Sequence, residues 1–175
     1  MPRWVWIIAG VTLLVALTAG GNYAMSSWMT SYNAQKWAQA LSSAEVRHVI
    51  PAGLLSRIAY QESHFVQAII DGTEPSPAGA LGMMQLMPQF FTTVRRPVPF
   101  SDQDTLDQIE EAATLLSGLY AHFGDWTAAT AAYNAGEGTI NRVLAGTLTL
   151  PTETANYIAK IGADLPNVVS GTLSA

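Results

Sequence analysis

Residues 101–124 read SDQDTLDQIEEAATLLSGLYAHFG, a stretch with the period of a long amphipathic helix. Its apolar residues recur at spacings of three and four, which places them on one buried face of a helix; they are Ile109, Ala112, Ala113, Leu116, Leu119 and Tyr120. Ser101 and Asp102 are of the type that caps a helix start, and Gly124 is of the type that follows a helix end. The stretch predicts one long helix ending near Phe123–Gly124.

Shorter helical patterns lie on both sides of this stretch. Pro51 can occupy a first helical turn, and the period of Leu54, Leu55, Ile58 and Ala59 predicts a helix that ends around Ser63–His64. Two more helices are expected, over residues 126–134 with a stop at Gly136 and over residues 152–161.

Two segments between the helices contain Gly and Pro. Residues 71–79, DGTEPSPAG, hold two prolines and two glycines and therefore predict a loop. Leu81–Met87 is expected to form one or two helical turns, closed by Pro88. Because no run alternates as a strand does, the predicted fold class is all-α or mostly α.

The N-terminus has the composition of a membrane segment. Residues 4–20, WVWIIAGVTLLVALTAG, are almost wholly apolar, and Arg3 is the only charge before Lys36. This pattern predicts a transmembrane anchor over residues 1–25, with its N-terminus in the cytoplasm. A cleaved signal peptide is the alternative, and both interpretations send the residues after Met25 across the membrane.

The remaining boundaries follow from composition. Residues 26–43 are interpreted as a stalk, with a short helix over 33–41; its aromatic residues Trp28, Tyr32 and Trp37 are candidates for packing against partner helices. The domain proper is expected over residues 44–164, followed by a flexible tail over 165–175.

Charge and residue usage exclude several classes of function. The net charge is −5, and Arg95–Arg96 is the only adjacent basic pair, so we expect no nucleic-acid binding. There are no cysteines, and His48, His64 and His122 lack metal-ligand spacing. We therefore expect no metal and no cofactor.

Glu62, in the sequence IAYQESHF, is the first candidate for chemistry. It follows an apolar helix and precedes Phe65, where partial desolvation of a carboxyl group raises its pKa and suits it to donate a proton. The alternative is an exposed Glu at a helix C-terminus.

Two further clusters contain polar side chains beside Gly or Met. In residues 78–88, AGALGMMQLMP, Gln85 lies among methionines that make either an adaptable wall or a core turn. In residues 131–138, AAYNAGEG, Tyr133 offers a ring face to a sugar and Asn134 an amide. The alternative there is a helix end with Asn134 or Gly136 in the left-handed conformation.

Four motifs in order make this chain resemble the soluble lytic transglycosylase (SLT) catalytic domain, a lysozyme-like fold of bacteria and their phages. The resemblance covers roughly residues 44–162. It rests on Glu62-Ser63 with Phe65, on residues 76–88, on residues 132–136, and on Glu153-Thr154 with Asn156-Tyr157.

The resemblance implies roles for individual residues. Glu62 would be the sole catalytic carboxylate, and Tyr157 would approach it. The implied substrate-binding residues are Ser63, Ser76, Gln85, Tyr133, Asn134 and Tyr157. We further expect that Tyr157 and the apolar neighbourhood of Ile58 and Met84 tune the pKa of Glu62.

One departure from the family concerns the spacing between Phe65 and Ser76, which is longer here. The extra stretch, around residues 69–75, is expected to be a loop near the cleft. It carries Asp71 and Glu74, the only acidic candidates nearby in sequence for a second carboxylate.

The implied reaction is cleavage of the MurNAc-β-1,4-GlcNAc bond of peptidoglycan with formation of 1,6-anhydromuramic ends. The alternatives are a muramidase, in which water replaces the C6 hydroxyl, and a non-catalytic component that binds peptidoglycan. The expected setting is local wall opening for a trans-envelope assembly or phage genome entry. The expected partners are glycan strands, membrane lipid through residues 4–25, and components of a virion or of a secretion or conjugation machine. The expected location is the inner membrane with a periplasmic domain, or a virion membrane.

Overall fold

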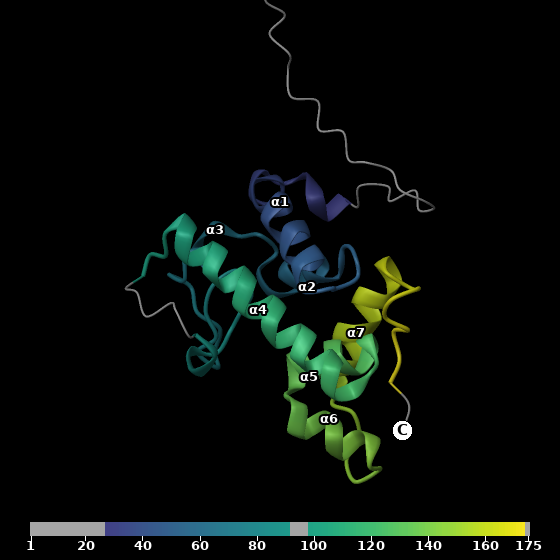
Figure 1. Ribbon diagram of the computed structural model, residues 1–175. Helices are drawn as coiled ribbons and strands as arrows, with labels where there is room; N and C mark the ends of the chain where they lie inside the picture. The colour runs from purple at the N-terminus through teal and green to yellow at the C-terminus, as the bar shows by residue number, and fades with distance from the viewer. Residues whose placement is uncertain (1–26, 92–97, 174–175) are drawn as a thin grey trace, which may run out of the picture.

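The computed structural model describes residues 27–91 and 98–173, and these residues are mostly helical (Figure 1). The elements are η1 (Ser27–Thr30), α1 (Tyr32–Arg47), α2 (Leu54–Ser63), α3 (Gln67–Ile70), η2 (Pro88–Phe90), α4 (Asp102–Phe123), α5 (Trp126–Ala135), α6 (Glu137–Leu144) and α7 (Thr152–Asp164). Within the described ranges, the β pairing is limited to one antiparallel bridge between Leu81 and Leu86. The all-α prediction is confirmed.

Helix α4 runs through the middle of the molecule, with α1 and α2 along one side and α5 at its C-terminal end (Figure 1). Ser101 and Asp104 form a reciprocal capping box at its start, and Gly124, with φ of 68°, ends it. The predicted long helix is therefore confirmed. One residue differs: Tyr120 is 37% exposed and stacks on Trp126 with ring centroids 4.0 Å apart, so it lies at the edge of the buried face.

Helix α2 begins at Leu54, three residues later than Pro51 suggested. Gly53 has φ of 86°, outside the helical region, and it precedes the first helical residue. The buried Glu45 of α1 accepts hydrogen bonds from the backbone amides of Gly53 (2.9 Å) and Ser56 (3.0 Å). A carboxylate of the preceding helix thus caps α2, in place of a capping side chain next to the helix start.

Helix α1 contradicts the predicted stalk over residues 26–43. Trp37 is only 4% exposed, and Ala34 and Leu41 are fully buried in the common core. Asn33 donates a side-chain hydrogen bond to the carbonyl of Phe65, 3.0 Å away at the end of α2. The helical domain therefore includes α1 from residue 32 onward, and Trp37 packs within its own chain and is not available to partner helices.

Residues 81–87 form a tight turn and not the predicted helical turns. Leu81 and Leu86 exchange backbone hydrogen bonds of 3.0 and 3.2 Å around it. Gly82 and Gln85 have φ of 77° and 47°, which no right-handed helix accommodates. A side-chain carbon at Gly82 would overlap the buried carboxamide of Gln108 on α4, so the close packing of α4 against this turn requires glycine.

The C-terminal residues also differ from the prediction. Helix α7 continues to Asp164, and the expected flexible tail turns back onto the domain, with Leu165 and Val169 buried in the core. Two helices that the sequence did not predict are the single-turn α3 and the two-turn α6, because short helices contain too few turns to show a helical period.

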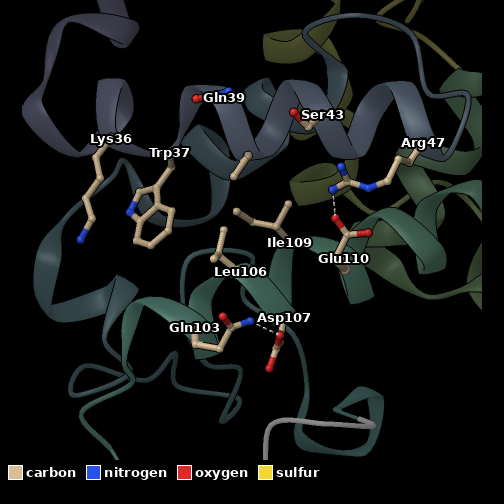
Figure 2. Close-up of a pocket in the computed structure, with 11 residues that line it drawn as sticks. Lys36, Trp37, Gln39, Ser43, Arg47, Gln103, Leu106, Asp107, Ile109 and Glu110 are labelled. Atoms are coloured by element: carbon tan, nitrogen blue, oxygen red, sulfur yellow. Dashed lines mark hydrogen bonds and ion pairs between the residues drawn. The ribbon is translucent and has the colours of Figure 1, made fainter.

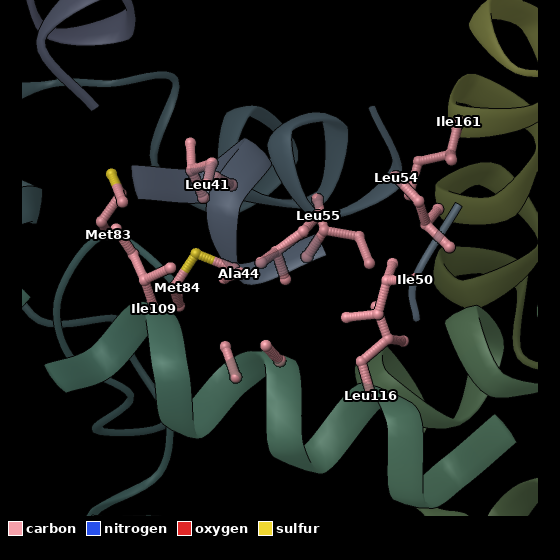
Figure 3. Close-up of a cluster of buried hydrophobic side chains, with 14 of the residues drawn as sticks. Leu41, Ala44, Ile50, Leu54, Leu55, Met83, Met84, Ile109, Leu116 and Ile161 are labelled. Atoms are coloured by element: carbon pink, nitrogen blue, oxygen red, sulfur yellow. The ribbon is translucent and has the colours of Figure 1, made fainter. Parts of the chain in front are cut away.

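The core lies between α1, α2, α4, α7 and the 81–86 turn, as the buried side chains in Figure 3 show. Met83 and Met84 reach into it from the turn, beside Leu41 of α1 and Ile109 of α4. None of the helices in residues 27–91 and 98–173 has the length and apolarity that a membrane crossing requires. The predicted anchor over residues 1–25 lies outside the described residues.

Candidate active site

Glu62 lies in the last turn of α2, immediately before a strained chain reversal. His64 and Phe65 have φ of 48° and 56°, in the left-handed region that non-glycine residues rarely adopt. Phe65 is 3% exposed and anchors the reversal in the core, and Asn33 holds its carbonyl. The reversal ends α2 one residue after Glu62, so the carboxylate projects from a fixed helix end.

The hydroxyl of Tyr157 on α7 donates a hydrogen bond of 2.6 Å to Oε1 of Glu62. Burial removes water from the Glu62 carboxyl and raises its pKa from 4.5 to about 7. The Tyr157 hydrogen bond opposes this shift because it favours the carboxylate, and the negative charge of Glu153 adds to it. The raised pKa agrees with the prediction made from the apolar flank of Glu62.

A cleft of about 290 Å³ opens beside this pair, lined by Gln61, Glu62, Asn134, Glu153, Asn156, Tyr157 and Lys160. Four of these residues are on α7, at positions 153, 156, 157 and 160. Spacings of three and four place them on one face of the helix. Helix α7 therefore forms one wall of the cleft, and the end of α2 forms the wall opposite.

Tyr133 and Asn134, at the end of α5, reach the same region by different contacts. The Tyr133 hydroxyl donates to the carbonyl of Met84 at 2.9 Å, and burial and the charge of Glu62 raise the pKa of Tyr133 well above its usual value. Asn134 lines the cleft, and its Oδ1 accepts a hydrogen bond of 2.8 Å from Thr154. Gly136, with φ of 84°, ends α5, so this segment is a helix end and a cleft wall together.

Three predicted substrate-binding residues use their side chains within the chain. Ser63 is fully buried; its hydroxyl donates to the Ala59 carbonyl at 2.9 Å and accepts from the Phe65 amide at 3.2 Å. Ser76 accepts from the Ala80 amide at 2.9 Å and shapes the loop before the 81–86 turn. Gln85 donates to the Gly82 carbonyl at 3.0 Å. The structure does not bring these three side chains to the cleft lining.

Several cleft residues had no predicted role, namely Gln61, Glu153, Asn156 and Lys160. Helical spacing could have predicted three of them, since Glu153, Asn156 and Lys160 share the helical face of Tyr157. The acidic residue whose charge acts on Glu62 is Glu153 and not Asp71 or Glu74 of the inserted loop. Asp71 instead accepts hydrogen bonds from Thr73 within that loop.

A larger hollow of about 470 Å³ lies between α1 and α4 (Figure 2). Arg47 and Glu110, which form an ion pair, are among its lining residues, as is Lys36, whose ammonium pairs with Asp102 and lies 4.7 Å from the ring centre of Trp37. None of the predicted site residues lines it. The larger hollow is therefore not the candidate active site, although its volume exceeds that of the cleft beside Glu62.

Residues 39–156 match the sequence family described as the transglycosylase SLT domain. The chain belongs to this family. The match includes Glu62 at the end of α2 and the start of α7 up to Asn156.

One solved structure to which this chain is similar is an inactive mutant of the lytic transglycosylase Slt from Pseudomonas aeruginosa. The similarity has 26% sequence identity and a TM-score of 0.49, and it covers 77% of this chain. It covers 22% of the Slt chain, so the SLT-domain protein described here spans about a fifth of that protein's length.

Proposed function

We propose that this protein is a peptidoglycan lytic transglycosylase that uses Glu62 as its single acid and base. The observation that carries the proposal is the Glu62 carboxyl itself: it is desolvated, its pKa is raised to about 7, and Tyr157 holds one of its oxygens. A group with such a pKa is half protonated near neutral pH, so it can both donate and accept a proton there.

The proposed reaction has two proton transfers. Because Tyr157 donates to Oε1, the transferable proton is assigned to Oε2 of Glu62. This proton passes to the glycosidic oxygen between MurNAc and GlcNAc as the C1–O bond breaks. The N-acetyl group of the muramic acid stabilises the developing positive charge. The Glu62 carboxylate then removes the proton of the C6 hydroxyl, whose oxygen bonds to C1 and closes the 1,6-anhydro ring.

Glu153 is assigned an electrostatic role. Its charge raises the pKa of Glu62, which keeps the acid protonated at higher pH. A muramidase with two carboxylates would instead use a second acid as nucleophile or as base for water. The products distinguish these mechanisms, because hydrolysis leaves a reducing end and the transglycosylase reaction leaves an anhydro end.

The test is mass spectrometry of the fragments that the full chain releases from purified peptidoglycan. We expect anhydromuramic ends from the wild-type chain and none from Glu62→Gln, with the fold of the variant checked by circular dichroism. Reducing ends would replace the proposal with a muramidase. A folded wild-type chain that binds peptidoglycan and releases nothing would replace it with a binding role.

The proposed location is a membrane, with the SLT domain on the outer side, through the apolar residues 4–20. The proposed task there is local wall opening for an assembly that crosses the envelope or for phage genome entry. The test expresses the full chain and a chain beginning at residue 27 and compares their membrane fractions after alkaline extraction. Equal distribution of the two chains would refute the anchor.

A further inference from the structure

The buried Arg57 forms hydrogen bonds with two residues that line one end of the cleft. Its side chain is 5% exposed, its Nη1 donates to Oε1 of Gln61 at 2.8 Å, and its Nη2 donates to the carbonyl of Lys160 at 3.1 Å. Its Nε donates to Asp164, which offsets its charge. One buried guanidinium therefore connects α2 to the C-terminal half of α7.

This contact determines the orientation of the Gln61 amide. A guanidinium has donors and no acceptor, so Gln61 must turn its oxygen toward Arg57. The Nε2 amino group of Gln61 then points away from Arg57, and Gln61 lines the cleft. The amino group of Gln61 is therefore the part of its amide that can donate to a ligand in the cleft.

Lys160 adds a positive charge at the same end. It is exposed, it lines the cleft, and its main chain is held by Arg57. Glu153 gives the cleft a negative charge, and Glu153 and Lys160 are separated by about 10 Å along α7 at ~1.5 Å per residue. Tyr157, which donates to the proton donor Glu62, lies between them on α7, about one helical turn from Lys160. The cleft therefore has an acidic end at Glu153 and a basic end about one turn from the Tyr157–Glu62 pair.

We propose that Lys160 and Gln61 form a subsite for a carboxylate carried by the substituent of a muramic acid residue. The inference rests on the proposed function and specifies its substrate. The sugar backbone of peptidoglycan is uncharged, and its carboxylates are on the stem peptides or, where peptides are absent, on the lactyl ether of muramic acid. A carboxylate accepts from both an ammonium and an amide group, which an uncharged sugar hydroxyl does less strongly.

The test measures binding in the full chain with Glu62→Gln, so that ligands remain intact. The ligands are a short soluble glycan fragment with stem peptides, the same fragment with its carboxyl groups converted to amides, and the peptide-free fragment with lactyl carboxylates. We expect amidation to weaken binding by about fivefold, the effect of one exposed charge pair. Adding Lys160→Met should abolish this ratio, and Lys160→Arg should preserve it. Lys36→Met, on α1, is the matched control and should leave the ratio unchanged.

The peptide-free fragment identifies which carboxylate binds. If it binds more tightly than the amidated fragment, and Lys160→Met removes this difference, the subsite also accepts the lactyl carboxylate; if it binds as weakly as the amidated fragment, the subsite accepts only a stem-peptide carboxylate. Equal affinity for all three fragments would overturn the proposal, and so would a Lys160→Met variant that weakens binding of all three equally. Failure of the reaction is distinguishable, because a chain with a Lys160-dependent ratio that releases no anhydro ends would refute the reaction and leave the subsite standing.

Discussion

Three influences from different parts of the chain act on the pKa of the Glu62 carboxyl, two that raise it and one that lowers it. Loss of water and the charge of Glu153 favour the neutral acid, while the Tyr157 hydroxyl favours the carboxylate. Desolvation is the largest of them, and the resulting pKa is about 7. The Glu153 charge and the Tyr157 hydrogen bond are each removable by one substitution, and each removal should shift the pKa of Glu62 in a predictable direction.

The first prediction concerns folding stability. Because the pKa of Glu62 is about 7 in the folded chain against 4.5 in the unfolded chain, the folded state binds more protons between these values. Wild-type stability should therefore fall as pH rises from about 4.5 to 7, by at most ~3 kcal/mol. Glu62→Gln is neutral throughout, so relative to wild type it should gain ~1–3 kcal/mol at pH 8 over its value at pH 5. Urea unfolding at both pH values measures this, with the exposed loop variant Glu74→Gln as control; the same difference at both pH values would contradict it.

The second prediction concerns Glu153→Gln. Removing the negative neighbour removes a cause of the raised pKa, so the pKa of Glu62 should fall. The alkaline limb of the pH profile of kcat/KM, where the acid loses its proton, should move to lower pH. The profile is measured by release of soluble fragments, and Glu137→Gln on α6 is the control. An unshifted limb would contradict this electrostatic role, and complete loss of activity would indicate that Glu153 takes part in the bond-breaking step itself.

The third prediction has the opposite sign. Tyr157→Phe removes the hydrogen bond that favours the carboxylate, so the pKa of Glu62 should rise and the alkaline limb should move to higher pH. The ring remains, so packing is kept. A limb that moves to lower pH in this variant would show that the hydroxyl does not act on Glu62 in solution.

At the scale of elements, α1 is the least expected part of the site. Its Asn33 holds the reversal after Glu62, and its Glu45 caps the start of α2. Helix α2 is thus supported at both ends by the helix before it. A helix whose first part was predicted to be a stalk therefore positions Glu62.

The fourth prediction tests whether α1 is part of the folded domain. Trp37→Ala should destabilise the domain by ~3–5 kcal/mol, the usual cost of deleting a buried aromatic side chain. Tyr32→Ala, on the same helix and 80% exposed, should change stability by less than ~0.5 kcal/mol. Both are measured by urea unfolding of the full chain. Similar small effects for the two variants would mean that α1 is a separate stalk.

At the scale of the whole molecule, α7 is held in place from two sides. Arg57 ties it to α2, and the residues after Asp164 fold back over it, so closely that a side chain at Gly162 would overlap the backbone of Gly171. The Tyr157–Glu62 hydrogen bond joins residues 95 positions apart and depends on this placement.

The fifth prediction concerns the tail. Val169 is fully buried, so Val169→Ala should destabilise the domain by about 2 kcal/mol. The exposed neighbour Asn167→Ala should have little effect. Thermal unfolding monitored by circular dichroism compares the two. An unchanged unfolding temperature for Val169→Ala would indicate that the residues after Asp164 do not pack on the domain.

Local patterns in the sequence were sufficient for the helices α2, α4, α5 and α7 and for the all-α fold class. A helical period needs only neighbours three and four residues away, and caps such as Ser101 act within one turn. The resemblance of four short motifs pointed to Glu62 and Tyr157, and the apolar residues around Glu62 were enough to predict the direction of its pKa shift.

Tertiary structure decided the rest. Helix α1 packs into the domain core, and the negative charge that acts on Glu62 belongs to Glu153 and not to Asp71 or Glu74. The hydroxyls of Ser63 and Ser76 form hydrogen bonds within the chain. Tertiary structure also turned the Gln61 amide toward Arg57. The physical reason is that desolvation, charge and hydrogen bonding depend on which distant segments meet, and helical periodicity contains no information about that.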